Sequence, residues 1–171
     1  MFALSRRAAF VVIAALASAV ACKDAPKDST DSEIEVRAVA RVLPPLQQEI
    51  ASQKAELTLP GSWRYGYKMT DKPDTTTGAF HAVEFYFSDS VSKAPPRMLL
   101  VIRVYKKATW DRISSKQGAV SRKLAEHDGN VYAFSIVTSN PYSLNTPAAL
   151  RVDAMMMDLT GPASPFKIEF K

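Results

Sequence analysis

The chain has 171 residues, with 22 Lys and Arg against 17 Asp and Glu, so its formal net charge is +5 at neutral pH. This excess is too small to indicate nucleic-acid binding, which normally goes with a strongly basic domain. We therefore expect no nucleic acid among its partners. The length suits one domain that buries a hydrophobic core.

The first 21 residues have the organisation of a secretory signal peptide. Arg6 and Arg7 give a positive start, the run 8–20 is almost entirely small and apolar, and small residues lead up to Cys22. A signal peptide needs these three parts. The apolar run is shorter than the ~20 residues with which a helix crosses a bilayer. We therefore predict a cleaved signal peptide over residues 1–21.

Cys22 is the only cysteine of the chain, so it can form no intramolecular disulfide. The sequence Ala19-Val20-Ala21-Cys22 resembles the lipobox of bacterial lipoproteins, although Ala19 stands where leucine is usual. The resemblance implies cleavage before Cys22 and attachment of a lipid, with fatty acids such as palmitate, to its sulfur. The alternative is ordinary cleavage that leaves a free N-terminal cysteine.

Residues 22–33 contain no large apolar side chain, and such a segment cannot offset the entropy of ordering. We predict a disordered tether there, followed by a single domain over 34–171. Under the enterobacterial sorting rule for lipoproteins, Lys23 directly after the cysteine favours the outer membrane. The expected location is the cell envelope, with the domain facing the periplasm and the membrane contacted through the lipid.

Residues 34–57 fit both a strand and a helix, because apolar residues recur there at twos and also at threes and fours. Pro44-Pro45 interrupts either element. We predict a short element that ends at Leu43, and then a helix from Leu46 to about Lys54.

The pattern is clearer from residue 57 onward. An extended run over 57–59 and a strand over 63–69 precede a turn-rich loop over 70–78. Residues 79–88 alternate as a strand does, and the apolar, β-branched run 98–105 is the best candidate for a central strand.

A hairpin is predicted over residues 119–139, with strands 119–126 and 130–139 joined through Asp128-Gly129, a usual tight-turn pair. Thr109 is the expected N-cap of a short helix that buries Trp110 and Ile113.

A second helix is predicted over 147–159, where Pro147 suits the first turn, Thr146 is the cap and Gly161 the stop. Leu150, Ala154 and Met157 share one face of it, and at least one of the three consecutive methionines at 155–157 must be exposed. The run 166–170 predicts a last strand. Together the elements predict an α+β fold: a mainly antiparallel sheet of five to six strands with two or three helices.

No catalytic or metal-binding set is evident. The two histidines, His81 and His127, have no metal-ligand spacing, so we expect no metal and no cofactor. Ser-x-x-Lys occurs twice without the accompanying motifs of an acyltransferase. His81 is expected to be a half-buried strand residue that is hydrogen-bonded to backbone, and Glu84 to pair with Arg103 or Lys106 on a neighbouring strand.

Aromatic residues on the strands are the remaining indication of a site. If several share the uncovered sheet face with Lys68, Arg103 and Lys106, that face could bind an envelope protein or a cell-wall component, as could the loop 139–146. This reading predicts a non-enzymatic binding or interaction module. The alternatives are a small-molecule binder with a pocket near His81 and Trp63 or, less favoured, an envelope hydrolase whose polar triad the sequence spacing hides. The candidate binding residues are Trp63, Tyr65, His81, Asn140 and Tyr142.

Three segments carry a looser resemblance: LTLPGSW at 57–63, MLLVIRVYKKATW at 98–110 and EHDGNVYAFSIVTSNPY at 126–142. They are similar to a group of uncharacterised small exported bacterial proteins, which implies no activity. More loosely, the Pro-x-x-Trp entry resembles the Mog1/PsbP-like α-β-α fold.

Overall fold

The computed structural model describes residues 43–64, 66–88, 93–115 and 121–171. The predicted signal peptide, Cys22 and the tether lie outside the described residues, as do Tyr65 and residues 34–42 of the first expected element. By internal contacts the chain divides into residues 1–39 and 40–171. The fold given below is that of the second unit.

A small sheet joins the two ends of this unit. It contains β1 (Leu46–Ile50), β2 (Ala55–Leu59) and β8 (Lys167–Phe170), with β2 in the centre and both neighbours antiparallel.

The predicted helix from Leu46 to about Lys54 is wrong. That segment forms β1 and a 3-10 turn at Ala51–Gln53, and Lys54 reverses the chain with a φ of 48°. β1 takes its hydrogen bonds from β2, with Leu46 opposite Leu59. Pairing with a partner strand decided an element whose local spacing fits either state.

A large sheet of five antiparallel strands has the order β3-β4-β5-β7-β6. The strands are β3 (Tyr67–Pro73), β4 (His81–Phe87), β5 (Arg97–Lys106), β6 (Arg122–His127) and β7 (Asn130–Ile136). The prediction that residues 98–105 form a central strand is confirmed. The loop predicted from Thr70 begins later, because β3 pairs with β4 as far as Pro73. The predicted α+β fold class is confirmed, with the strands divided between two antiparallel sheets.

The hydrophobic core lies between the two sheets and helix α2 (Pro147–Thr160). Alternate residues of the large sheet point into it, such as Phe85, Leu100 and Ile102, and the small sheet contributes Leu57 and Leu59. We call this the inner face of the large sheet. The opposite, outer face carries residues such as Glu84, Val101 and Arg103, which alternate with the core residues along the same strands.

The residues predicted to begin and end helix α2 are confirmed. Thr146 caps it, with its Oγ1 accepting from the Ala149 amide at 3.2 Å, Pro147 stands in the first turn and Gly161 ends it. The face shared by Leu150, Ala154 and Met157 is the exposed one, and the core side is formed instead by residues that include Val152, Met155 and Leu159. Met155 is buried and Met157 exposed, as three consecutive methionines require.

Helix α1 (Lys107–Ser114) begins two residues before the predicted cap, Thr109. Lys106 is the N-cap and makes no side-chain capping bond, since β5 runs directly into the helix. Trp110 and Ile113 pack, half-buried, against Tyr105 and Ala133 on the outer face of the large sheet. The short helix is thus held by packing rather than by its cap.

The β6–β7 hairpin is confirmed, with Asp128 and Gly129 at φ 47° and 70° in its turn. Positive φ at both central positions is the geometry that Asp-Gly favours. β7 ends at Ile136, and residues 119 and 120 of the predicted first strand lie outside the described part. The hairpin also reaches the small sheet, because the ring of His127 stacks on that of Phe170 with centroids 4.1 Å apart.

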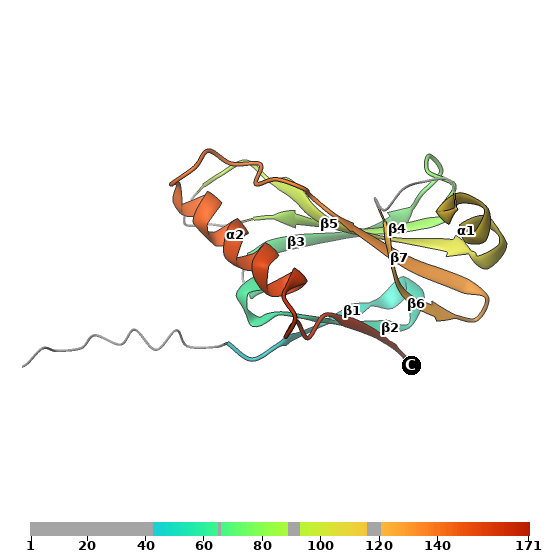
Figure 1. Ribbon diagram of the computed structural model, residues 1–171. Coiled ribbons are helices and arrows are strands. Elements are labelled where there is room, and N and C mark those ends of the chain that lie inside the picture. The colour runs from blue at the N-terminus through green and yellow to red at the C-terminus, as the bar shows by residue number, and fades with distance from the viewer. Residues whose placement is uncertain (1–42, 65, 89–92, 116–120) are drawn as a thin grey trace, which may run out of the picture. The chain divides into compact units, whose positions relative to one another are not determined.

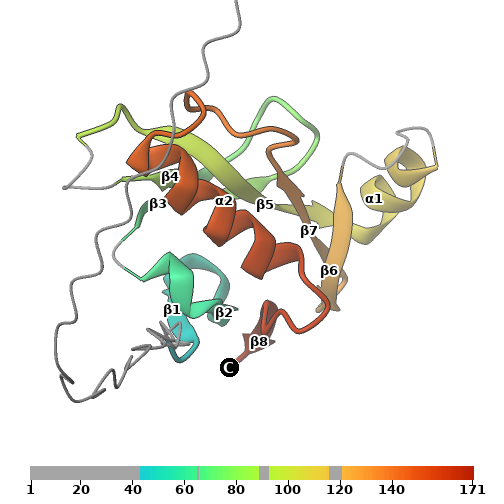
Figure 2. The same ribbon diagram turned by 60° about the vertical axis from the view of Figure 1, so that its left-hand side comes forward.

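The two helices lie at opposite ends of the large sheet (Figure 1). Turning the molecule shows α2 running alongside both sheets, whereas α1 projects near β6 and β7 (Figure 2). The large sheet is therefore covered by the small sheet and α2 on its inner face and by α1 at one end of its outer face.

Candidate functional site

Three polar side chains from different elements converge at one end of the inner face. Ser52 comes from the turn between β1 and β2, Asp71 from β3 and His81 from β4. Ser52 Oγ donates to Asp71 Oδ1 at 2.8 Å and lies 3.0 Å from His81 Nε2, which also contacts Asp71 Oδ1. The expected backbone partner of His81 is thus replaced by two side chains.

This cluster does not have the geometry of a catalytic triad. In a triad the acid holds one ring nitrogen and the nucleophile meets the other, whereas Ser52 and Asp71 both meet Nε2 of His81. The Ser52 hydroxyl also gives its hydrogen to the carboxylate. The cluster instead fastens the β1–β2 turn to the edge of the large sheet.

The hydrogen bonds of the cluster act on the ionisation of Asp71. Burial alone would raise the pKa of the Asp71 carboxyl, but the bonds from His81 and Ser52 bring that pKa below its usual value of 3.8. The charged form of Asp71 is therefore the one that the fold stabilises.

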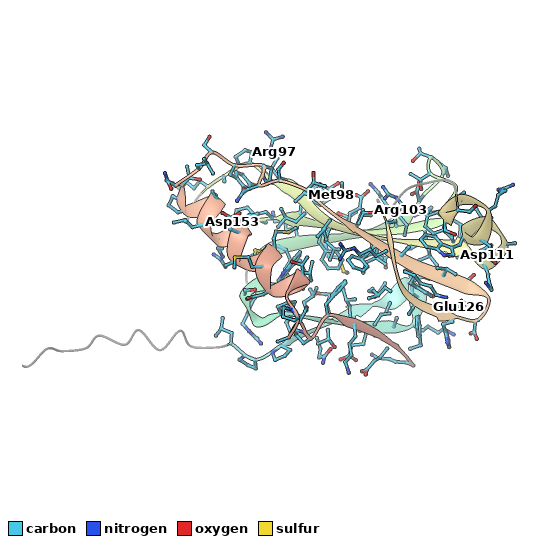
Figure 3. All side chains as sticks on the ribbon, viewed as in Figure 1. Arg97, Met98, Arg103, Asp111, Glu126 and Asp153 are labelled. Carbon is cyan, nitrogen blue, oxygen red and sulfur yellow. The ribbon has the colours of Figure 1, made fainter. Side chains whose placement is uncertain are left out.

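A groove of ≈490 Å³ opens on the outer face of the large sheet. Its floor is apolar, with Met98, Val101 and Tyr105 of β5, and Arg103 and Ser135 add polar groups. Thr77, from the loop between β3 and β4, forms part of its rim. In Figure 3, Met98 and Arg103 lie along β5 on the side of the large sheet away from the small sheet. An apolar hollow with a few convergent polar groups is the usual form of a small-molecule site.

The groove has a fixed cation. Arg103 Nε donates to Asp74 Oδ2 at 3.2 Å, and the side chains are 24% and 8% exposed. Asp74 is itself held by the Thr76 amide and hydroxyl on Oδ1 and by the Thr77 hydroxyl on Oδ2. Burial would raise the pKa of Asp74, but these hydrogen bonds hold it far below 3.8. Asp74 is therefore a permanent anion that orients the guanidinium.

A second ion pair lies beside the groove. Lys72 Nζ is 2.8 Å from Glu84 Oε2, and the Tyr86 hydroxyl donates to the same oxygen at 2.8 Å. The prediction that Glu84 pairs with Arg103 or Lys106 is wrong, because β3 supplies a nearer lysine from the other neighbouring strand. Burial would raise the pKa of Glu84, but the Lys72 and Tyr86 bonds, with the charge of Arg103, lower it.

Another cavity, of ≈580 Å³, lies where the described chain begins and α2 ends. Leu43, Pro60, Met157 and Pro162 are among its lining residues. Ser62 also lines it, and among the described residues its Oγ is the buried side-chain oxygen that has no hydrogen-bond partner. None of the described residues that line the cavity is cationic. This cavity is thus more apolar in character than the groove.

The predicted binding residues do not gather in one place. Trp63 is fully buried, its Nε1 donating to the Met155 carbonyl at 3.0 Å, and His81 belongs to the Ser52 cluster. Neither residue lines either cavity described above.

Asn140 and Tyr142 lie together in the loop before α2. Asn140 Nδ2 donates to the Ala149 carbonyl and to Asp153, and its Oδ1 accepts from the Tyr142 amide. The Tyr142 ring packs edge-on against Phe87. These contacts order the loop 139–146. The remaining predicted binding residue, Tyr65, lies outside the described residues.

The expected aromatic and basic sheet face exists in part. Tyr86 and Tyr105 share the outer face with Lys68 and Arg103, whereas Tyr67 and Tyr132 point into the core. Lys106 lies at the end of β5, where it bonds Asn130 and sits over the ring of Phe80.

Several site residues were not found from the sequence. Met98 and Ser135 carry no sequence signal of a binding site. Ser52 lies in the predicted helix and Asp71 in the predicted turn-rich loop, so the sequence did not predict that they meet. The Asp74-Thr75-Thr76-Thr77 run does carry a signal, because Asp followed by Thr favours side-chain hydrogen bonds to nearby backbone.

Within the described segments, no group of three or more His, Cys, Asp or Glu is placed to hold a metal ion. In the same part of the chain, none of the helices has the length and apolar character needed to cross a bilayer. Comparison with protein-family models, curated proteins and solved structures finds no match to this chain.

Proposed function

We propose that the chain is a lipid-anchored protein of the cell envelope that binds a small amphiphilic ligand, without catalysis, on the outer face of its large sheet. The observation that carries this proposal is the groove, which combines an apolar floor with a fixed guanidinium. The anchor rests on the N-terminal sequence and the lipobox resemblance. An envelope protein or cell-wall partner stays a prediction for the same face and for the loop 139–146.

The cluster of Ser52, Asp71 and His81 does not support a hydrolase. The Ser52 hydroxyl is bonded to a carboxylate, and the ring nitrogen that should accept its proton is shared with that carboxylate. Nor do Ser52, Asp71 and His81 line either cavity. Binding therefore remains the function that the geometry supports best.

The groove can be tested by protection of an engineered thiol. Because Cys22 is the only cysteine, Ser135→Cys places a single new thiol inside the groove. The full-length chain is purified in phosphatidylcholine nanodiscs and treated with a water-soluble maleimide, with and without the neutral probe octanamide. Peptide mass spectrometry identifies the modified cysteine. We expect octanamide to slow alkylation of Ser135→Cys several-fold.

Ser143→Cys is the matched control, because Ser143 is exposed in the loop before α2 and outside the groove. Octanamide should leave its alkylation rate unchanged. Adding Met98→Gln to Ser135→Cys, which makes the floor polar at similar size, should raise the octanamide concentration needed for protection. Equal protection at both positions, or none at position 135, would contradict the proposal.

A further inference from the structure

The guanidinium of Arg103 is only partly used by the protein. Its Nε donates to Asp74, and among the described residues its two terminal nitrogens make no hydrogen bond. Arg103 lines the groove next to the apolar residues Val101 and Tyr105. A planar guanidinium with two terminal donors free matches the two oxygens of a carboxylate.

Asp74 does not depend on Arg103 for its own position. Both of its oxygens already accept from Thr76 and Thr77. The carboxylate therefore serves as a fixed support for the arginine. Because the Arg103 side chain is already ordered, less conformational entropy is lost when a ligand binds to it. Such a support is typical of a binding group and is more than an exposed ion pair needs.

We propose that the groove selects a small monoanion, a carboxylate carried on an apolar body. The inference rests on the proposed function and names its ligand class. The carboxylate accepts from the terminal nitrogens of Arg103, and the apolar body lies against Met98, Val101 and Tyr105. Thr77 and Ser135 also line the groove, where the Thr77 hydroxyl donates to Asp74 and the Ser135 hydroxyl pairs with that of Ser121.

The charges around Arg103 favour one negative charge over two. Asp74 contacts the guanidinium, and Glu84 is near enough for the charge of Arg103 to lower its pKa. Lys72 is paired with Glu84. A dianion such as a phosphate monoester would therefore add a third and fourth negative charge around one arginine, whereas a neutral ligand leaves its donors unmatched.

The test compares three probes that share an eight-carbon chain: octanoate, octanamide and octyl phosphate. Each probe is tested for its ability to protect Ser135→Cys from the maleimide, in the full-length chain in nanodiscs. The free aqueous concentration of the probe is measured in each experiment. We expect octanoate to protect at a concentration about tenfold lower than octanamide, because a charge-assisted hydrogen bond is stronger than a neutral one. Octyl phosphate should be weaker than octanoate.

Arg103→Met in the Ser135→Cys chain removes the charge and keeps an apolar side chain of similar length. It should abolish the preference for octanoate, so that octanoate and octanamide protect at similar concentrations, and protection by either probe shows that the groove is intact. Arg97→Met is the control, because Arg97 is exposed on the same strand and does not line the groove.

The outcomes separate this inference from the proposed function. Equal protection by octanoate and octanamide would overturn the anion selectivity while the binding function stands. A preference for octyl phosphate would overturn the choice of a monoanion. Failure of all three probes would contradict the binding function itself.

Discussion

Ser52, Asp71 and His81 meet at the junction of the two sheets, and their contacts predict a dependence of stability on pH. The folded protein holds the pKa of Asp71 below 3.8. A carboxyl with a lowered pKa in the folded state stabilises it at pH values above the unfolded pKa, and this contribution disappears as the pH falls through the folded pKa. Asp74 and Glu84, whose pKa values are also lowered, add to the same trend.

Asp71→Asn should therefore flatten the acid limb of the stability curve. We expect the free energy of unfolding of the variant to decrease less than that of the unaltered chain when the pH is lowered from neutrality to below 3.8. Urea denaturation at a series of pH values measures this. Asp158→Asn is the control, since Asp158 is exposed and makes no hydrogen bond among the described residues. Parallel curves for Asp71→Asn and the unaltered chain would contradict the interpretation.

Single residues were predictable where their role is local. Thr146 and Gly161 act within one helix end, and Asp128-Gly129 within one turn, so the sequence alone indicates them. Arg103 was placed on a sheet face, but its support by Asp74 depends on a loop that returns to the sheet. Trp63 was expected at a binding pocket and is instead the centre of an aromatic group with Tyr67 and Phe85. Trp63 lies in a 3-10 turn at Gly61–Trp63 rather than on the predicted strand, and an aromatic residue gives no local indication of whether it will enter the core or line a pocket.

At the scale of the element, α2 depends on its cap more than α1 does. Thr146→Ala removes the acceptor for the Ala149 amide and should lower the free energy of unfolding by about 1 kcal/mol. Thr160→Ala is the matched control in the same helix, because the Thr160 hydroxyl only donates back to the Met156 carbonyl and should contribute little. Urea denaturation of the two variants compares them directly. Equal losses would show that the cap has no special role.

Elements with a strong local signal were predicted, and elements decided by a partner were not. The run 98–105 is apolar except for Arg103, as suits a strand in the centre of a sheet, and it forms most of β5. β1 has a spacing that fits a helix equally well, and only its pairing with β2 decides the outcome. The division into two sheets follows from the same cause, since β8 pairs with a strand near the start of the domain.

At the scale of the whole molecule, the proposed location depends on Cys22. In cells labelled with radioactive palmitate, the full-length chain should incorporate label, and Cys22→Ala should incorporate none. The chain has no other cysteine to receive the lipid, so the variant tests the one possible thioether site. Ser18→Ala, within the predicted signal peptide, is the control and should keep the label. A labelled Cys22→Ala chain, or an unlabelled parent, would contradict the lipid anchor.

The small sheet joins strands from opposite ends of the domain, with β2 held between β1 and β8. A polypeptide emerges from the ribosome with its N-terminus first. One edge of β2 therefore stays unpaired until residues 167–170, which form its partner strand β8, have been made. During that interval its backbone donors and acceptors face solvent, which is the condition in which strands join to those of other molecules. The order of synthesis thus makes the last described strand the one that protects the earliest part of the fold from aggregation.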